Sequence, residues 1–135
     1  MVLHSDLAEL KRLAAWIEGW ARQGVSSDVS FAVQLCLEEA VANVIMYGGV
    51  SNARLKIVIE IERNGTTLVA QVVDNGRQFD PTQAPPPSMP TSLVEAKIGD
   101  LGIHLMRSFA SGMHYERRDG CNRLTLRFKE SRATS

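Results

Sequence analysis

Two alternating segments joined by a short turn place the strongest limit on how this chain can fold. In residues 54–62 the apolar side chains recur at every second position, and residues 66–73 alternate in the same way. Asn64-Gly65 lies between the segments and is a strong signal for a hairpin turn. The pattern therefore predicts two antiparallel strands with an apolar face, which a second layer of structure has to cover.

A second hairpin is predicted near the end of the chain. Residues 113–118 and 122–129 are separated by Asp119-Gly120, another turn signal. Leu124, Leu126 and Phe128 alternate with polar side chains and indicate that one face of the last strand lies in a core.

Three helices are predicted around these strands. The first starts near Ser5-Asp6, where Asp6 can cap, and ends at Gly24. The second follows a Ser26-Ser27-Asp28 capping cluster and covers residues 29–47, and a third covers residues 101–111. Strands and helices together predict an α+β two-layer sandwich, with a mixed, mostly antiparallel sheet and helices on one face.

The second helix carries two polar residues where apolar ones are expected. On a helical wheel it is apolar around most of its circumference, which indicates a helix covered on most sides. Glu39 and Asn43 fall four residues apart in the middle of one apolar face. They form either a partly hydrated polar pair at a helix edge, or an enclosed site where Glu39 polarises a water and Asn43 offers an oxygen to Mg²⁺.

Two glycine-containing turns also have two possible interpretations, one structural and one functional. Asp74-Asn75-Gly76 follows a predicted strand, so it is either a simple strand-end turn or a place where Asp74 accepts an amino group of adenine and Gly76 lets the base approach. Gly99-Asp100-Leu101-Gly102 precedes the third helix. It is either a flexible helix entry or a set of backbone N–H groups facing a phosphate.

Composition excludes several other classes. A chain of 135 residues suits one domain, and 15 basic against 15 acidic residues disfavours a nucleic-acid binder. We find no signal peptide, no unbroken apolar run long enough to span a membrane, and no P-loop pattern. Cys36 and Cys121 are expected to be free thiols in a reducing cytoplasm. The proline-rich stretch at 82–98 is expected to be a flexible loop.

Four motifs in order resemble the GHKL ATPases, and most closely their anti-sigma-factor serine/threonine kinase branch. They are residues 38–47 (EEAVANVIMY), 73–81 (VDNGRQFDP), 99–106 (GDLGIHLM) and 115–126 (YERRDGCNRLTL). The resemblance covers about residues 5–129 and implies a Bergerat-type ATP-binding fold in a single domain, residues 1–135, with 82–98 as the ATP lid. Members of this family usually begin with a strand, which here is missing or very short.

The resemblance also implies a role for each matching residue. Glu39 matches the general base and Asn43 the Mg²⁺ ligand, while Asp74 matches the adenine-reading aspartate with Gly76 beside the base. Phosphate-contacting positions match Gly99, Leu101 and Gly102, and an adenine-pocket threonine matches Thr125. The resemblance implies that the cofactors of this protein are ATP and Mg²⁺.

The implied function is phosphorylation of a serine or threonine on an anti-sigma-factor antagonist, which regulates transcription by partner switching. The implied partners are that antagonist and a sigma factor. The resemblance also implies a homodimer in the cytoplasm that binds neither nucleic acid nor a membrane. The alternative is a non-catalytic module of the same fold that sequesters a regulatory partner. A detached histidine-kinase domain is disfavoured because no helix pair with a phospho-acceptor histidine is present.

Overall fold

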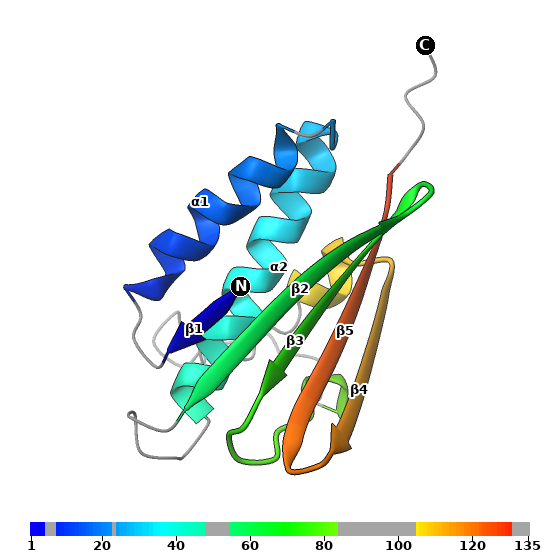
Figure 1. Ribbon diagram of the computed structural model, residues 1–135. Helices are drawn as coiled ribbons and strands as arrows, with labels where there is room; N and C mark the ends of the chain where they lie inside the picture. The colour runs from blue at the N-terminus through cyan, green and yellow to red at the C-terminus, as the bar shows by residue number, and fades with distance from the viewer. Residues whose placement is uncertain (5–7, 23, 48–54, 84–104, 131–135) are drawn as a thin grey trace, which may run out of the picture.

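Two helices lie on one face of a five-stranded sheet in the computed structural model of the protein (Figure 1). The structure describes residues 1–4, 8–22, 24–47, 55–83 and 105–130. Within these ranges the elements in chain order are β1 (Val2–His4), α1 (Glu9–Ala21), α2 (Ser27–Tyr47), β2 (Lys56–Asn64), β3 (Thr67–Asp74), the 3-10 turn η1 (Pro81–Gln83), β4 (Gly112–Arg118) and β5 (Cys121–Lys129).

The strand order across the sheet is β1-β2-β3-β5-β4. All pairings between the described strands are antiparallel, so the expected mixed character of the sheet is wrong for this part of the chain. The reason is that β2–β3 and β4–β5 are hairpins, and β3 and β5 then meet in opposite directions. β1 has only three residues, which confirms the expectation of a very short first strand.

Both predicted hairpins are present, but one turn is shifted by a residue. Asn64 pairs with Thr67, so the two central turn residues are Gly65 and Thr66, not Asn64 and Gly65. Gly65 has φ of 61°, which fits the first central position of a II′ turn. The other hairpin turns at Asp119-Gly120 as predicted, and their φ values of 54° and 75° are those that a type I′ turn requires.

The helix starts differ in how well the capping signals predict them. Ser26 accepts a hydrogen bond on Oγ from the Val29 backbone N–H at 3.3 Å, so the predicted cap of α2 is confirmed. α1 begins later than predicted, at Glu9, and Ala8 at its N-cap makes no side-chain cap. The predicted cap Asp6 lies outside the described residues. Gly24, with φ of 93°, stands just after the end of α1 as expected.

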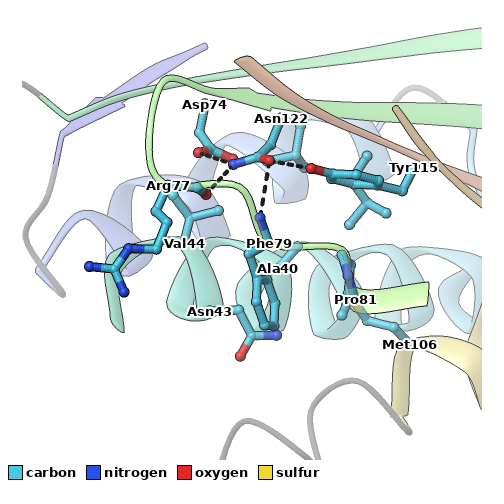
Figure 2. A pocket seen from close by; sticks show the side chains of 12 residues that line it. Ala40, Asn43, Val44, Asp74, Arg77, Phe79, Pro81, Met106, Tyr115 and Asn122 are labelled. Atoms are coloured by element: carbon cyan, nitrogen blue, oxygen red, sulfur yellow. Dashed lines mark hydrogen bonds between the residues drawn. The ribbon is translucent and has the colours of Figure 1, made fainter. Parts of the chain in front are cut away.

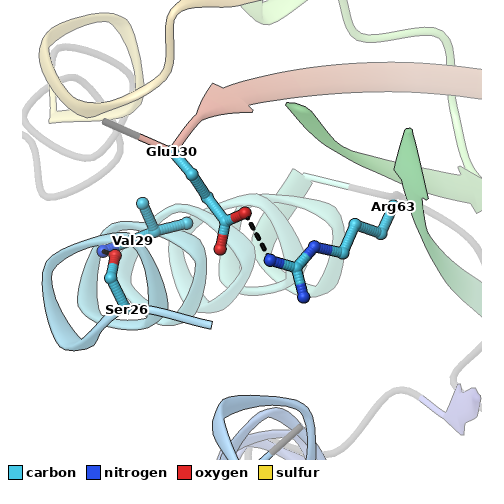
Figure 3. A network of polar contacts seen from close by, with 4 residues as sticks. All are labelled: Ser26, Val29, Arg63 and Glu130. Atoms are coloured by element: carbon cyan, nitrogen blue, oxygen red, sulfur yellow. Dashed lines mark hydrogen bonds and ion pairs between the residues drawn. The ribbon is translucent and has the colours of Figure 1, made fainter. Parts of the chain in front are cut away.

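The core lies between the helices and the covered face of the sheet. The side chains that fill it are fully buried, among them Leu13, Ile17, Leu37, Val41, Ile57, Ile59 and Leu126. At the far end of the sheet, Arg63 on β2 reaches Glu130 after β5, with Nη2 and Oε2 at 2.7 Å, close to the start of α2 (Figure 3). This ion pair links the end of β2 to the residue that follows β5, beside α2.

α2 is the central helix of this layer. Ser27–Met46 is long enough to cross a membrane, and its mean hydropathy of 1.5 is high enough, although polar residues interrupt its apolar sequence. Its position explains this composition, because α2 packs against α1 on one side and against β3 and β5 on the other. The apolar circumference noted in the sequence is thus the mark of a helix covered on several sides.

Some expectations fall on residues outside the described ranges. Residues 84–98 of the expected lid and 101–104 of the third helix belong to this group. Residues 105–109 are helical, as predicted, and Pro81–Gln83 forms a short 3-10 turn at the start of the proline-rich stretch.

Candidate functional site

A pocket with about 430 Å³ of empty space lies between α2 and the ends of β3, β4 and β5 (Figure 2). The polar side chains that line it are Asn43, Asp74, Arg77, Tyr115 and Asn122. Its apolar walls are formed by Ala40, Val44, Val72, Phe79, Pro81, Met106 and Leu124. Two of the predicted site residues, Asn43 and Asp74, therefore meet in one pocket although they are far apart in sequence.

Asp74 stands at the end of β3 with its carboxylate in the pocket. Only 4% of the residue is exposed. Oδ1 accepts a hydrogen bond from the Gly76 backbone N–H at 2.9 Å and another from Asn122 Nδ2 at 3.0 Å. Burial raises the pKa of Asp74, while these hydrogen bonds and the charge of Arg117 act in the opposite direction without cancelling the rise. The site holds a carboxylate that is costly to ionise, which is typical of a group reserved for a ligand.

Asn122, which the sequence analysis did not single out, holds this corner together. Nδ2 donates to Asp74 and, at 2.8 Å, to the Arg77 carbonyl, while Oδ1 accepts from Tyr115 Oη and from the Phe79 N–H at 3.3 Å. Both donor hydrogens and both acceptor positions of the amide are thus used. The available signal was that Asn122 shares the face of Leu124, Leu126 and Phe128, where a polar residue needs partners.

Gly76 tightens the turn that follows Asp74. Besides donating to Asp74, it accepts a hydrogen bond on its carbonyl from Arg117 Nη1 at 2.8 Å. Asn75, the residue between them, accepts on Oδ1 from the Lys56 N–H at 2.8 Å. The turn is anchored to β2 and β4, which fixes where the Asp74 carboxylate points.

Asn43 projects from α2 on the other side of the pocket (Figure 2). It is 3% exposed, and its Nδ2 has no hydrogen-bond partner in the part of the chain that the structure describes. A buried amide without a partner costs about 1–3 kcal/mol. The free Nδ2 group is suited to donate a hydrogen bond to an acceptor on a bound ligand.

Glu39 lies one helical turn before Asn43 but is not among the residues that line the pocket. Its side chain is partly exposed. Burial raises the pKa of Glu39 above its ordinary value, and the neighbouring charge of Glu38 adds to the rise. The structure therefore brings Asn43 and Asp74 together and leaves Glu39 at the edge of this group.

The remaining predicted residues are not part of the described pocket lining. Thr125 alternates with Leu124 and Leu126 on β5, so its side chain is on the face of the sheet away from the pocket. Gly99, Leu101 and Gly102 are outside the described residues. Within the described ranges no group of three or more His, Cys, Asp or Glu side chains is placed to hold a metal ion.

The pocket combines apolar walls with a carboxylate acceptor on one side and an unpartnered amide on the other. Such an arrangement suits a flat aromatic group that carries an amino donor toward Asp74. An anionic or metal-bound part of the same ligand would then lie toward Asn43.

The sequence matches the histidine kinase-like ATPase domain family over residues 3–128. It is 35% identical over 112 residues to the serine/threonine-protein kinase BtrW of Bordetella bronchiseptica, an alignment that covers 82% of this chain and 79% of that protein.

Solved structures show the same fold. The RsbU and RsbW domains of a Mycobacterium tuberculosis protein match with a TM-score of 0.66 and 14% identity, over 98% of this chain. The chain spans only 32% of that protein's length. The catalytic domain of the histidine kinase ThkA matches with a TM-score of 0.55 and 19% identity, over 96% of this chain and 95% of that one. The expected sandwich of helices on an antiparallel sheet is confirmed. With its motifs, its fold and this degree of identity to a serine/threonine kinase, the chain belongs to the histidine kinase-like ATPase domain family.

Proposed function

We propose that this chain is an ATP-dependent protein serine/threonine kinase that phosphorylates an anti-sigma-factor antagonist. It would act as a single domain, residues 1–135, in the cytoplasm, and regulate transcription through partner switching with a sigma factor. The family membership and the 35% identity to the kinase BtrW support phosphoryl transfer from ATP. The motifs of the anti-sigma-factor branch support the choice of partner.

The observation that carries the proposal is the pairing of Asp74 and Asn43 across one pocket. Both hydrogen bonds that Asp74 accepts from described residues end on Oδ1, so Oδ2 is available to a ligand. A base amino group can donate to Oδ2, and the apolar walls of the pocket can hold the ring. Adenine carries such an amino group at its edge, while guanine presents a carbonyl oxygen at the same ring position and would face the carboxylate with an acceptor.

Asn43 fits the Mg²⁺ end of the nucleotide. Asn43 is buried and lines the pocket, and its Nδ2 lacks a partner among the described residues. We propose that its Oδ1 is the ligand for this hard cation. Mg²⁺, when bound, would neutralise charge on the transferring phosphoryl group. Gly99, Leu101 and Gly102 are proposed to contact the phosphates through backbone N–H groups. Thr125 is the weakest of the predicted contacts, because it faces away from the pocket.

Glu39 is proposed as the base that accepts the proton of the substrate hydroxyl. A base works best when its pKa lies near the working pH, and the raised pKa of Glu39 moves in that direction. The position of Glu39 next to the pocket, one turn from Asn43, leaves a protein hydroxyl able to approach from solvent.

The test has two parts. Calorimetric titration with ATP, with and without Mg²⁺, should show binding that strengthens with the metal in the wild type and weakens in Asn43→Ala. Labelled phosphate should then pass from ATP to a serine of a purified antagonist. Absence of ATP binding at millimolar nucleotide would reject the proposal, and transfer that survives Glu39→Gln would remove Glu39 from the role of base.

One observation favours the non-catalytic alternative, a module that sequesters a partner and uses nucleotide only as a switch. Glu39 does not line the pocket in which Asn43 and Asp74 meet, so these two residues could hold a nucleotide without it. ATP binding with normal affinity but no transfer to any antagonist, together with stable capture of the partner, would support this second function.

A further inference from the structure

Arg107 joins two parts of the pocket wall that are far apart in the sequence. It belongs to the helical residues 105–109, and its Nη2 donates to the carbonyl oxygens of Pro81 at 3.3 Å and of Thr82 at 2.7 Å. Pro81 and Met106, the residue before Arg107, both line the pocket, and Figure 2 shows them at the same end of it. Arg107 itself is not among the residues that line the pocket. One guanidinium therefore connects two segments of the wall from behind.

The turn that carries Pro81 needs partners from outside itself. η1 consists of three residues. The first turn of a helix fixes several backbone dihedrals in return for one hydrogen bond, so an isolated turn of this length is unfavourable. The last carbonyl groups of a helix also lack partners within the helix. Arg107 supplies hydrogen bonds to two carbonyls of this kind, those of Pro81 and Thr82.

The two ends of η1 are held by different side chains. Asp80 caps the N-terminal end, because its Oδ1 accepts from the Thr82 backbone N–H at 2.8 Å and from the Thr82 hydroxyl at 2.6 Å. Arg107 binds at the carbonyl end, where a cation is favoured. The Asp80 cap is local and shapes the turn. Arg107 and the packing of η1 against β4 fix where the turn lies relative to the pocket.

The chemistry of the guanidinium suits this task. Its N–H donors are arranged at fixed angles in one plane, so one nitrogen can serve two carbonyls that lie close together. Arg107 makes no ion pair with a carboxylate of the residues that the structure describes. Its hydrogen bonds to η1 are thus the contacts through which it contributes to the pocket.

We infer that Arg107 is a positioning residue of the nucleotide site, which holds Pro81 and Met106 in one wall so that the apolar surface for the base is formed before ATP binds. The inference rests on the proposed function, because it concerns the same pocket. Arg107 acts through the wall and touches no part of the nucleotide. A site formed in advance binds more tightly, since the observed affinity falls in proportion to the fraction of molecules in the competent conformation.

Removing the donors tests the inference. Arg107→Met keeps a long side chain without an N–H group. If the ordered turn is then present in about a tenth of the molecules, the dissociation constant for ATP should rise about tenfold in calorimetric titration. Adenosine, measured by competition with ATP, should lose affinity by the same factor, because the wall holds the ring and not the phosphates. Arg107→Lys keeps a charged donor and should return the ATP constant to within about threefold of wild type.

A second measurement follows the turn without nucleotide. In the free protein, hydrogen exchange of the Thr82 N–H, observed by NMR, should become about tenfold faster in Arg107→Met. Exchange of the Ile59 N–H, which donates to the Met1 carbonyl, should not change. The matched control is Arg22→Met, at an exposed position after the end of α1, which should alter neither ATP affinity nor Thr82 exchange.

Several results would overturn the inference. Folded Arg107→Met that binds ATP as tightly as wild type, or that leaves Thr82 exchange unchanged, is incompatible with it. Loss of ATP affinity with adenosine affinity unchanged would place Arg107 at the phosphates instead. Arg107→Gln, whose amide is too short to reach both carbonyls, should behave like Arg107→Met and replaces it if circular dichroism shows that Arg107→Met is unfolded. Failure of the proposed function is a different result: a wild type that binds no ATP rejects that function, while Thr82 exchange still decides whether Arg107 holds the wall.

Discussion

Replacing Asp74 by asparagine should remove ATP binding while leaving the fold intact. The two side chains have the same shape, and the asparagine Oδ1 can still accept from the Gly76 N–H and from Asn122 Nδ2. The difference lies on the pocket side, where Oδ2, an acceptor, becomes an NH₂ group, a donor. A base amino group at that position would then face another donor.

The magnitudes follow from these contacts. A hydrogen bond to a charged group contributes about 1.5–3 kcal/mol and an unpaired buried donor costs about 1–3 kcal/mol, so the loss should be about 3–5 kcal/mol. That corresponds to ATP binding weaker by about a hundredfold or more.

The free energy of unfolding of Asp74→Asn should not fall with the ATP affinity. Because burial raises the folded pKa of Asp74 above 3.8, its contribution to stability is fully present below that pH and is lost as the pH rises through the folded pKa. At neutral pH the neutral asparagine avoids this cost. We therefore expect Asp74→Asn to be within about 1 kcal/mol of the wild type in free energy of unfolding, or more stable.

The assay combines calorimetric titration of ATP with urea unfolding of the same preparation. Asp119→Asn is the matched control, because Asp119 is exposed in the β4–β5 turn and asparagine accepts its φ of 54°. It should change neither quantity. ATP affinity in Asp74→Asn within about threefold of wild type would refute the role of Asp74, and loss of several kcal/mol of stability would refute the account of its burial.

Three further predictions concern the surroundings of the site. Asn122→Ala should lower the free energy of unfolding by about 2–4 kcal/mol in urea, and Tyr115→Phe by only about 1 kcal/mol, because the amide serves four partners and the hydroxyl one; equal losses would contradict the network. The kcat of the proposed transfer should fall as the pH falls through the Glu39 pKa, with a midpoint above the ordinary 4.5, since the carboxylate must be ionised to accept a proton; a midpoint at or below 4.5 in the pH–rate profile would argue against Glu39. Burial raises the pKa of Cys36 to about 12, so a thiol reagent at about pH 8 should label Cys121 first and Cys36 only on unfolding, as mass spectrometry would show; equal labelling rates in the native protein would contradict this.

The strands were the most predictable part of the fold. Alternation in β2, β3 and β5 requires one face to be buried, and a shift by one residue would expose the whole apolar set, so the pattern determines which side chains face the core. The turn was less certain, because Asn64-Gly65 and Gly65-Thr66 both place glycine at a central position. Pairing of Asn64 with Thr67 decides between them, and that is a property of the paired strands.

The site was predicted in part. Glu39 and Asn43 were found because polar residues break an apolar helix face, but the helix pattern could not tell that Asn43 lines the pocket and Glu39 does not. Asn122 was missed because its importance comes from partners on β3, β4 and the turn after Asp74. Thr125 was expected near the pocket from its motif, yet its position in the alternation of β5 places it on the other face.

The sequence alone was enough to predict the class of fold and the family, and to propose residues for ATP chemistry, because periodicity and motif order are local properties of the chain. Which of those residues share a pocket, which polar groups satisfy one another, and which face of the sheet remains open were decided only by tertiary structure. The physical reason is that these properties depend on distances between segments far apart in the sequence. Such distances are set by strand order and helix packing, and no single stretch of the sequence determines either.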